Sequence, residues 1–205
     1  VNVNTGTLSI LGWGTDTGTY NILAGAVANF ASGNRNLNSG FALTGPGTLN
    51  ISGANVSVNS ALTLGSQTTL QLSGGTLGGA GALTVTGAFN VTGRSTLAGT
   101  GTLTTQGVSL INIGSGSDYL SLTGGKSWVN QGTLTLGGDD YIYFGAYGGG
   151  NNTLTNAAGA TLNLSSSHSE VMAFYTGSAT VNNAGTLNQT QTGTHALNGS
   201  VAFNN

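Results

Sequence analysis

The residues of this chain that could do chemistry are few, and the acids among them follow a pattern. The 205 residues include five acidic and three basic side chains, two histidines and no cysteine. Asp118, Asp140 and Glu170 each come immediately before a short run of apolar and aromatic residues. If these runs are equivalent strands on stacked turns of the chain, the three acids form one column spaced by about 4.8 Å, with Asp139 beside it. One interpretation is a weak site for a divalent cation or sugar hydroxyls, and the other is solvated corner residues that prevent pairing outside the fold.

A second segment also suggests a divalent cation, in this case calcium. Gly114-Ser115-Gly116-Ser117-Asp118-Tyr119-Leu120 resembles the core of the calcium nonapeptide repeat. Such sites hold the ion between two successive turns, so a single copy lacks its partner. The favoured interpretation is a Gly/Ser corner that leads into a strand with an acid at its start. Apart from calcium, no cofactor is expected.

Aromatic residues in the same region are candidates for carbohydrate binding. They are Trp128, Tyr141, Tyr143 and Tyr147, with Tyr175 nearby. A period of two puts Tyr141 and Tyr143 on one face of a strand, and Ile142 and Phe144 on the other. Because Ile142 and Phe144 belong in the core, the two tyrosines should point to solvent, where an aromatic ring can stack on a pyranose. The alternative is that these tyrosines only make cross-strand pairs that cover the sheet.

Catalytic patterns are weak. His168 lies in a polar run of serines, and no serine has the glycine spacing of a nucleophile elbow. No histidine or aspartate cluster has metalloenzyme spacing, and no glycine-rich segment opens a helix as a phosphate loop must. The three basic residues, Arg35, Arg94 and Lys126, are scattered along the chain. We therefore expect that the protein is not an enzyme.

The elements that must position these residues are short repeated β runs. After Asn130–Leu136, Asp140–Phe144 and Asn152–Asn156, the pattern starts again at Gly159–Leu164. Apolar residues alternate with polar ones, as in Leu62-Thr63-Leu64, and no run has a helical period. A unit of three short strands cannot bury its apolar side alone and must stack on its neighbours. We predict an all-β fold, a right-handed parallel β-helix of about eight three-stranded coils. It should form a single domain over residues 1–205, a segment of a longer exported protein.

Composition excludes several classes of partner. The net charge is −2 and charged residues make up 4% of the chain, so nucleic acid is not an expected partner. No apolar run approaches the length that spans a bilayer, and no basic amphipathic segment could lie on one, so this segment should not contact a membrane. The absence of cysteine is compatible with export through an oxidising compartment.

Several phrases in the chain resemble the degenerate repeats of bacterial surface adhesins. They are Gly47–Gly53 (Gly-Thr-Leu-Asn-Ile-Ser-Gly), Gly81–Gly93, Trp128–Leu134 and Asn182–Leu187. Similar repeats occur in filamentous-haemagglutinin-like and autotransporter-type proteins, whose passengers are right-handed parallel β-helices. The resemblance implies a structural or adhesive segment of an exported cell-surface or extracellular-matrix protein. Cell-surface glycans or a matrix polysaccharide are then the expected partners.

Other functions remain open alternatives. A carbohydrate-binding or polysaccharide-cleaving solenoid is the first, because lyases occur on the same fold, although fold alone does not imply their activity. An ice-binding face is another, but Thr133-Leu134-Thr135 and Thr153-Leu154-Thr155 do not share a register. Self-association is also expected, because neither terminus offers a helix or charge cluster that would cap the open end of a solenoid.

Overall fold

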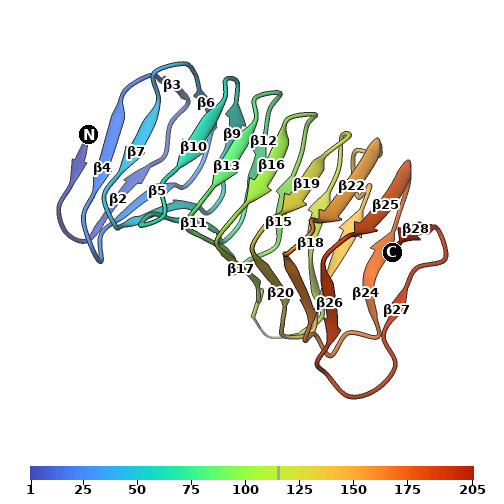
Figure 1. Cartoon of the computed structure of the whole chain (residues 1–205). Helices are drawn as coiled ribbons and strands as arrows, with labels where there is room; N and C mark the ends of the chain where they lie inside the picture. Colours follow the sequence, from blue (N-terminus) through green and yellow to red (C-terminus); the bar gives the residue numbers. More distant parts are fainter. Residues whose placement is uncertain (115) are drawn as a thin grey trace.

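The computed structural model describes residues 1–114 and 116–205, and these residues form 28 β-strands and no helix. The described residues therefore contain no helix with the length and hydropathy needed to span a membrane. Strands of two to six residues alternate with glycine-rich corners, as the repeated runs predicted. From β1 to β25, every strand except β7 pairs in parallel with the strand three places further along the chain, which stacks the coils of a β-solenoid (Figure 1).

The strands lie on three faces. The β1 face holds β1 (Asn2–Val3), β4 (Thr19–Ile22) and β7 (Ala42–Thr44), then a separate sheet of β10 (Leu62–Leu64), β13 (Leu83–Val85), β16 (Thr102–Thr105), β19 (Ser127–Asn130), β22 (Asn151–Asn156), β25 (Ser178–Asn183) and β28 (Val201–Asn204). The β2 face holds β2 (Thr7–Ile10), β5 (Val27–Phe30), β8 (Thr48–Ile51), β11 (Thr69–Leu72), β14 (Ala88–Val91), β17 (Val108–Ile111), β20 (Thr133–Leu136), β23 (Thr161–Leu164) and β26 (Thr186–Gln189). The β3 face holds β3 (Gly14–Asp16), β6 (Asn34–Leu37), β9 (Asn55–Val58), β12 (Thr76–Gly78), β15 (Ser95–Leu97), β18 (Asp118–Leu122), β21 (Asp140–Phe144), β24 (Glu170–Phe174) and β27 (Ala196–Leu197).

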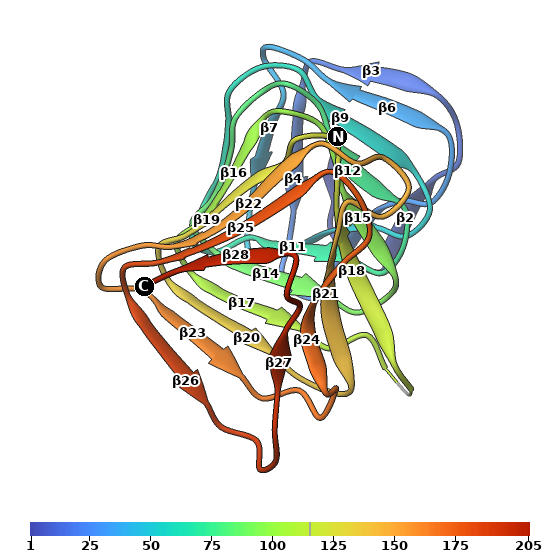
Figure 2. The same cartoon turned by 90° about the vertical axis from the view of Figure 1, so that its right-hand side faces the viewer.

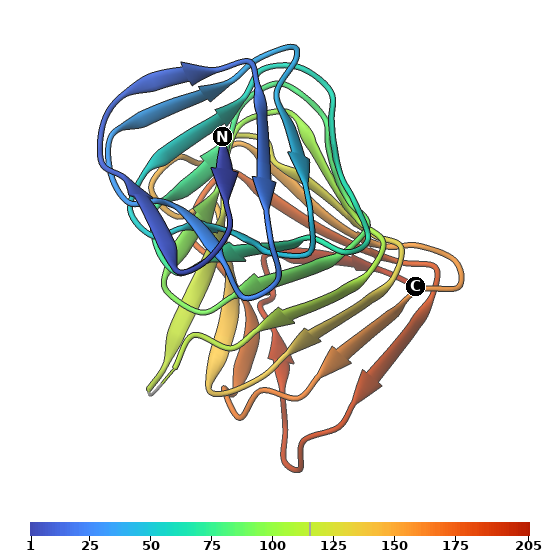
Figure 3. The same ribbon diagram turned by 90° about the vertical axis from the view of Figure 1, so that its left-hand side faces the viewer.

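The β2 and β3 faces each have nine strands, so the chain makes nine coils, one more than the estimate from the sequence. Seen from the N-terminal end in Figure 3, the chain turns clockwise from β1 through β2 and β3 as it moves away from the viewer. This sense makes the coil right-handed. The structure therefore confirms the predicted three-sided, right-handed parallel β-helix.

Alternation of apolar and polar residues builds the interior. In β8 and β11 the second and fourth residues are buried, and the first and third are partly exposed. Parallel pairing in register stacks the inward residues of successive coils, so Leu49 lies on Leu70 and Leu70 on Phe89. All three side chains are at most 2% exposed. The burial of these apolar columns is the main contribution to the stability of the fold. A single coil could not bury its apolar residues without its neighbours.

Asparagines also point inward, at one corner of the β1 face. Asn130 donates to Asn156, Asn156 to Asn183, and Asn183 to Asn205, with N to O distances of 2.8, 2.8 and 2.7 Å. Asn130 and Asn156 are fully buried. Stacked amides satisfy one another from coil to coil, which removes the penalty of burying an unpaired amide.

Two stacked corners show why glycine is required where coils touch. Gly79 has a φ of +107°, and a Cβ there would lie 2.2 Å from the carbonyl oxygen of Val58. Gly99, one coil further on, has a φ of +76°, and its Cβ would lie 2.6 Å from the carbonyl oxygen of Gly79. Both the positive φ and the close backbone approach exclude larger residues.

The β1 face is interrupted between β7 and β10. The corners that precede these two strands enclose a cavity of about 280 Å³, lined by residues that include Leu37, Phe41, Ser60 and Leu62. None of the residues that line it is titratable. The cavity therefore has no group suited to acid–base chemistry.

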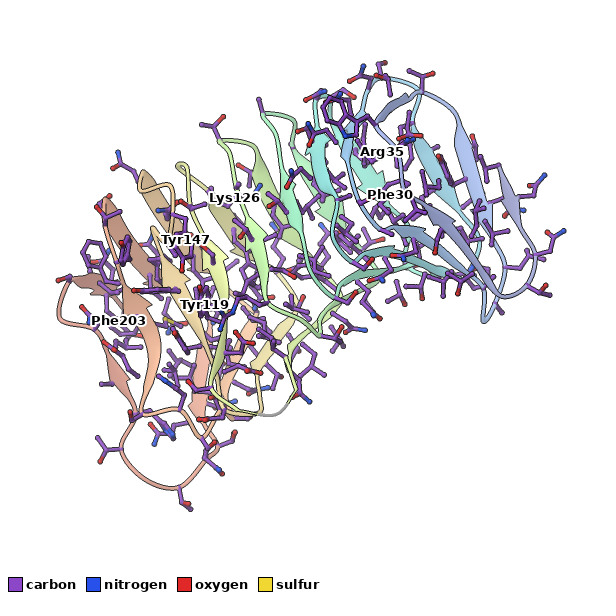
Figure 4. All side chains as sticks on the ribbon, turned by 180° about the vertical axis from the view of Figure 1, so that it is seen from behind. Phe30, Arg35, Tyr119, Lys126, Tyr147 and Phe203 are labelled. Atoms are coloured by element: carbon purple, nitrogen blue, oxygen red, sulfur yellow. The ribbon has the colours of Figure 1, made fainter. Side chains whose placement is uncertain are left out.

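Lys126 is buried inside the coil, with only 4% of its surface exposed (Figure 4). Its Nζ donates to the carbonyl oxygen of Gly101 at 2.7 Å rather than to a carboxylate. Burial lowers the pKa of Lys126 from 10.5 to about 8. At neutral pH the folded chain therefore holds a poorly solvated charge.

Stability should consequently rise with pH. From about pH 8 upward, the unfolded chain binds more protons at Lys126 than the folded chain, because only the folded pKa is lowered. Between about pH 8 and pH 10 the free energy of unfolding should increase by about 2 kcal/mol, which raises the melting temperature by roughly 4 to 8 °C. Lys126→Met should abolish the rise and melt higher than the natural chain at neutral pH. A natural chain whose melting temperature is flat or falls over this interval contradicts the assignment.

Candidate functional site

Strand register brings tyrosines together on the outside of the β3 face. The pairing of β18 with β21 sets Tyr119 beside Tyr141 and Ser121 beside Tyr143. In β21, Ile142 is fully buried, whereas both tyrosines of that strand are partly exposed. The predicted outward orientation of Tyr141 and Tyr143 is therefore confirmed.

Five aromatic rings form a continuous cluster, called the tyrosine surface below. Its members are Tyr119, Tyr141, Tyr143, Tyr147 and Tyr175. The centroids of the Tyr119, Tyr141 and Tyr143 rings lie 5.2 to 5.7 Å apart, mostly edge to face. Tyr143 contacts Tyr175 at 5.7 Å. Such packing fixes the orientations of the rings.

Tyr147 projects furthest from this cluster and is 84% exposed. It has a φ of +59°, and it is the one non-glycine residue with a positive φ in the described chain. That conformation costs on the order of 1 kcal/mol for a bulky residue and persists because the surrounding turn enforces it. Here the Gly145 amide donates to Leu122, and the Tyr119 hydroxyl donates to that of Tyr147 at 3.3 Å (Figure 4). The turn therefore holds an apolar ring in water.

Tyr147 and Tyr175 together form an open pair. Their centroids are 6.3 Å apart and their planes differ by 35°, so the two rings are neighbours tilted against each other. Tyr175 is 58% exposed. Two neighbouring and largely exposed rings offer aromatic surface to a partly apolar ligand such as a pyranose.

Two polar side chains border the tyrosine surface. The Arg94 guanidinium lies 4.5 Å from the centroid of Tyr119 and pairs with Asp118 at 2.5 Å. His168 stacks on Tyr141 with a centroid distance of 4.4 Å and an interplanar angle of 23°. Tyr119, Arg94 and His168 also belong to this region, although the sequence pattern did not predict it. The phrase Asp118-Tyr119 matches Asp140-Tyr141 one coil later, and that match would have identified Tyr119.

The hydroxyls of Tyr119 and Tyr141 are neutral at physiological pH. Burial raises the pKa of Tyr119 to about 12, and the hydrogen bond to Tyr147 adds to the shift. Burial also raises the pKa of Tyr141. Each hydroxyl can therefore both donate and accept, which suits the hydroxyls of a sugar.

Trp128 does not belong to this surface, which corrects its assignment as a sugar-binding residue. It is fully buried, stacked between Leu103 and Leu154 of the neighbouring coils. Its ring meets Phe89 edge to face at 5.7 Å, and Nε1 donates to the Thr105 hydroxyl at 3.0 Å. Its role is in the core.

The four acids do not form the predicted cation site, although the register of the column is as expected. Asp118 lies opposite Asp140 in the register of β18 with β21. The register of β21 with β24 places Glu170 beside Asp140 on the following coil. Asp140, however, is fully buried, and its Oδ2 accepts from the amide of Ile113 at 2.6 Å. Burial raises the pKa of Asp140. It is therefore neither a surface ligand nor a solvated corner.

The other acids have separate partners. Asp118 pairs with Arg94, Asp139 accepts from the Ser167 hydroxyl at 3.3 Å, and Glu170 accepts from the side-chain amide of Asn198. Across residues 1–114 and 116–205, no group of three or more acidic or histidine side chains is placed to hold a metal ion. The calcium-repeat-like segment includes Ser115, which lies outside the described residues.

Comparisons with protein-family models, with curated proteins and with solved structures each find no match to this chain. The β-solenoid fold and the tyrosine surface are therefore the observations from which function must be argued.

Proposed function

We propose that this chain is a structural and adhesive segment of an exported bacterial cell-surface or matrix protein, and that it attaches to glycans through the tyrosine surface. The observation that carries the proposal is the exposed pair of Tyr147 and Tyr175. Elsewhere the outward positions of the strands are mainly threonine, serine and asparagine. The solenoid supplies a rigid rod, and the tyrosines supply a place on it where a sugar ring can stack.

Three features favour glycans over other ligands. Tyr119, Tyr141 and Tyr143 lie on paired strands and pack against one another, so their side chains lose little entropy on binding. The neutral hydroxyl of Tyr119 can both donate to and accept from the hydroxyls of a sugar. The surface also carries little net charge, because Arg94 is paired with Asp118, so neutral or weakly charged polysaccharides are the ligands it suits best.

The engagement of all three basic residues favours binding over cleavage. Arg35 is buried in an ion pair with Asp16, Arg94 pairs with Asp118, and Lys126 is buried within the coil. A lyase needs a basic group that is free to remove a proton from the sugar ring. None of the three is placed for that role, so we propose that bound glycan is held and not cut.

A glycan array tests the proposal. The natural chain should bind a set of glycans. The double variant Tyr147→Ala/Tyr175→Ala should lose about 5- to 150-fold in affinity, since each stacked ring contributes roughly 0.5 to 1.5 kcal/mol. Trp13→Ala is the matched control, because Trp13 is 80% exposed but lies far along the chain. Equal losses in the two variants would contradict a site at the tyrosines, and no binding by the natural chain would contradict the function.

A further inference from the structure

Two members of the tyrosine surface differ from the others because their rings lie mostly in water. Tyr147 is 84% exposed and Tyr175 is 58% exposed, whereas Tyr119 is buried and Tyr141 and Tyr143 are only partly exposed. This exposure does not arise at an end of the chain, since β27 and β28 form a further coil after Tyr175. Both phenol rings are therefore open to small reactants in solution.

The described chain offers an oxidant few other targets. It has no cysteine, and its single methionine, Met172, is fully buried. Of the two tryptophans, Trp128 is buried in the core, and Trp13 is exposed between β2 and β3 in the first coil. A reagent that takes single electrons from exposed, electron-rich rings therefore acts on Trp13 and on the pair of Tyr147 and Tyr175.

Backbone pairing places these two tyrosines on neighbouring coils. Tyr147 lies in the turn that follows β21, and Tyr175 comes directly after β24, the strand that pairs with β21 on the next coil (Figure 2). The Tyr175 amide donates to the carbonyl oxygen of Phe144 at 2.9 Å, which ties its corner to the preceding coil. With ring centroids 6.3 Å apart, the two phenols remain neighbours although they are far apart in the sequence.

The pair also has more freedom than the other rings of the cluster. Tyr143 lies nearer to Tyr175, at 5.7 Å, but its ring is packed against Tyr119 and Tyr141 as well. A covalent bond between two aromatic rings forms edge to edge, so at least one ring must be able to turn. Tyr147, with most of its surface in water, can turn its edge toward Tyr175.

From this geometry we propose that Tyr147 and Tyr175 form a dityrosine cross-link when hydrogen peroxide and a haem peroxidase supply the oxidation. Each hydroxyl loses one hydrogen atom, and the unpaired electron of each phenoxyl radical spreads to the ring carbons next to the oxygen. One such carbon of each ring joins in a new C–C bond, and the hydrogen on each of these carbons moves to its phenol oxygen as a proton. The two hydrogen atoms removed reduce one hydrogen peroxide to two waters.

The cross-link ties one coil covalently to the next. Because the reacting rings are already neighbours, the bond within one molecule forms in preference to bonds between molecules. Like a disulfide, it restricts the unfolded chain, so the linked protein should melt several degrees higher than the unlinked protein. The reaction requires no sugar, and the inference does not depend on glycan binding.

Peptide mapping after oxidation tests the proposal. In the unfolded product, trypsin cuts after Lys126 and a glutamate-specific protease cuts after Glu170. Tyr147 then lies in fragment 127–170, and Tyr175 is the one tyrosine of fragment 171–205. The folded chain, oxidised while dilute, should give these fragments joined and lighter than their sum by two hydrogen atoms, with a yield that does not change with protein concentration. Fragments that stay separate, or links that form only between molecules, overturn the proposal.

Three phenylalanine variants locate the bond. Tyr147→Phe and Tyr175→Phe keep the ring but lack the hydroxyl, so each should lose the joined fragments. Tyr143→Phe is the matched control, because it removes a hydroxyl from the same fragment as Tyr147 and from a ring that also contacts Tyr175. It should be linked as well as the natural chain, and circular dichroism should show the same β-sheet content in all variants. A link that survives Tyr147→Phe and disappears in Tyr143→Phe would place the bond at Tyr143 and overturn the assignment.

Discussion

Replacing Arg35 by methionine is expected to destabilise the N-terminal coils by about 3 to 5 kcal/mol. Arg35 and Asp16 are both more than 90% buried, and the guanidinium contacts the carboxylate through Nη2 at 2.5 Å and Nε at 3.0 Å. Tyr20 adds a hydrogen bond to Asp16 at 2.7 Å. Without the arginine, Asp16 would be a buried carboxylate with only the tyrosine as a partner, and it must then become protonated or disrupt the coil.

Urea unfolding of Arg35→Met measures this loss. Arg94→Met is the matched control, since it removes the same cation from a pair with Asp118 that is largely in water, and its cost should be below about 1 kcal/mol. The double variant Arg35→Met/Asp16→Leu should recover much of the lost stability, because it removes the unpaired charge as well. Similar costs for Arg35→Met and Arg94→Met would contradict the structure of this buried pair.

Trp128→Ala should cost about 3 to 5 kcal/mol, the amount typical for removing a large aromatic side chain from a packed core. Trp128 is the largest of the fully buried side chains, and its removal leaves a cavity between Phe89 and the neighbouring coils. It also leaves the Thr105 hydroxyl, which is fully buried, without its donor.

The control for this variant is Trp13→Ala, which changes an 80% exposed tryptophan and should shift the free energy of unfolding by no more than about 0.5 kcal/mol. Chemical denaturation of both variants gives the comparison. If Trp128→Ala were as mild as Trp13→Ala, Trp128 would not occupy the interior, and its earlier assignment to the sugar-binding surface would have to be reconsidered.

Alternation in the sequence was sufficient to predict the class of fold. Wherever both inward residues of a strand are aliphatic, as in Leu70 and Leu72, the alternation shows directly which side of the strand faces the core. The number of coils was less certain, because strands such as Gly14–Asp16 and Asn34–Leu37 contain too few apolar residues to be distinguished from corners. These strands form because they pair with strands of the neighbouring coils. Such partners cannot be recognised from the short segment of sequence that forms the strand itself.

The candidate sites were predicted less well because polar residues were assumed to face water. Asp140 is in phase with Ile142 and Phe144, so the same alternation that pointed the tyrosines outward placed this acid inside. Asn130 likewise shares its face with Trp128. Stacking can satisfy an inward polar side chain through the next coil, and this kind of partner lies more than twenty residues away in sequence.

A crystal structure of the chain soaked with an oligosaccharide to which it binds would test the central claim most directly. The account predicts a pyranose ring lying against Tyr147 or Tyr175, with sugar hydroxyls within hydrogen-bond distance of the tyrosine hydroxyls on the β3 face. A sugar bound on the β2 face, or in the cavity beside Phe41, with the tyrosine surface bare, would contradict it.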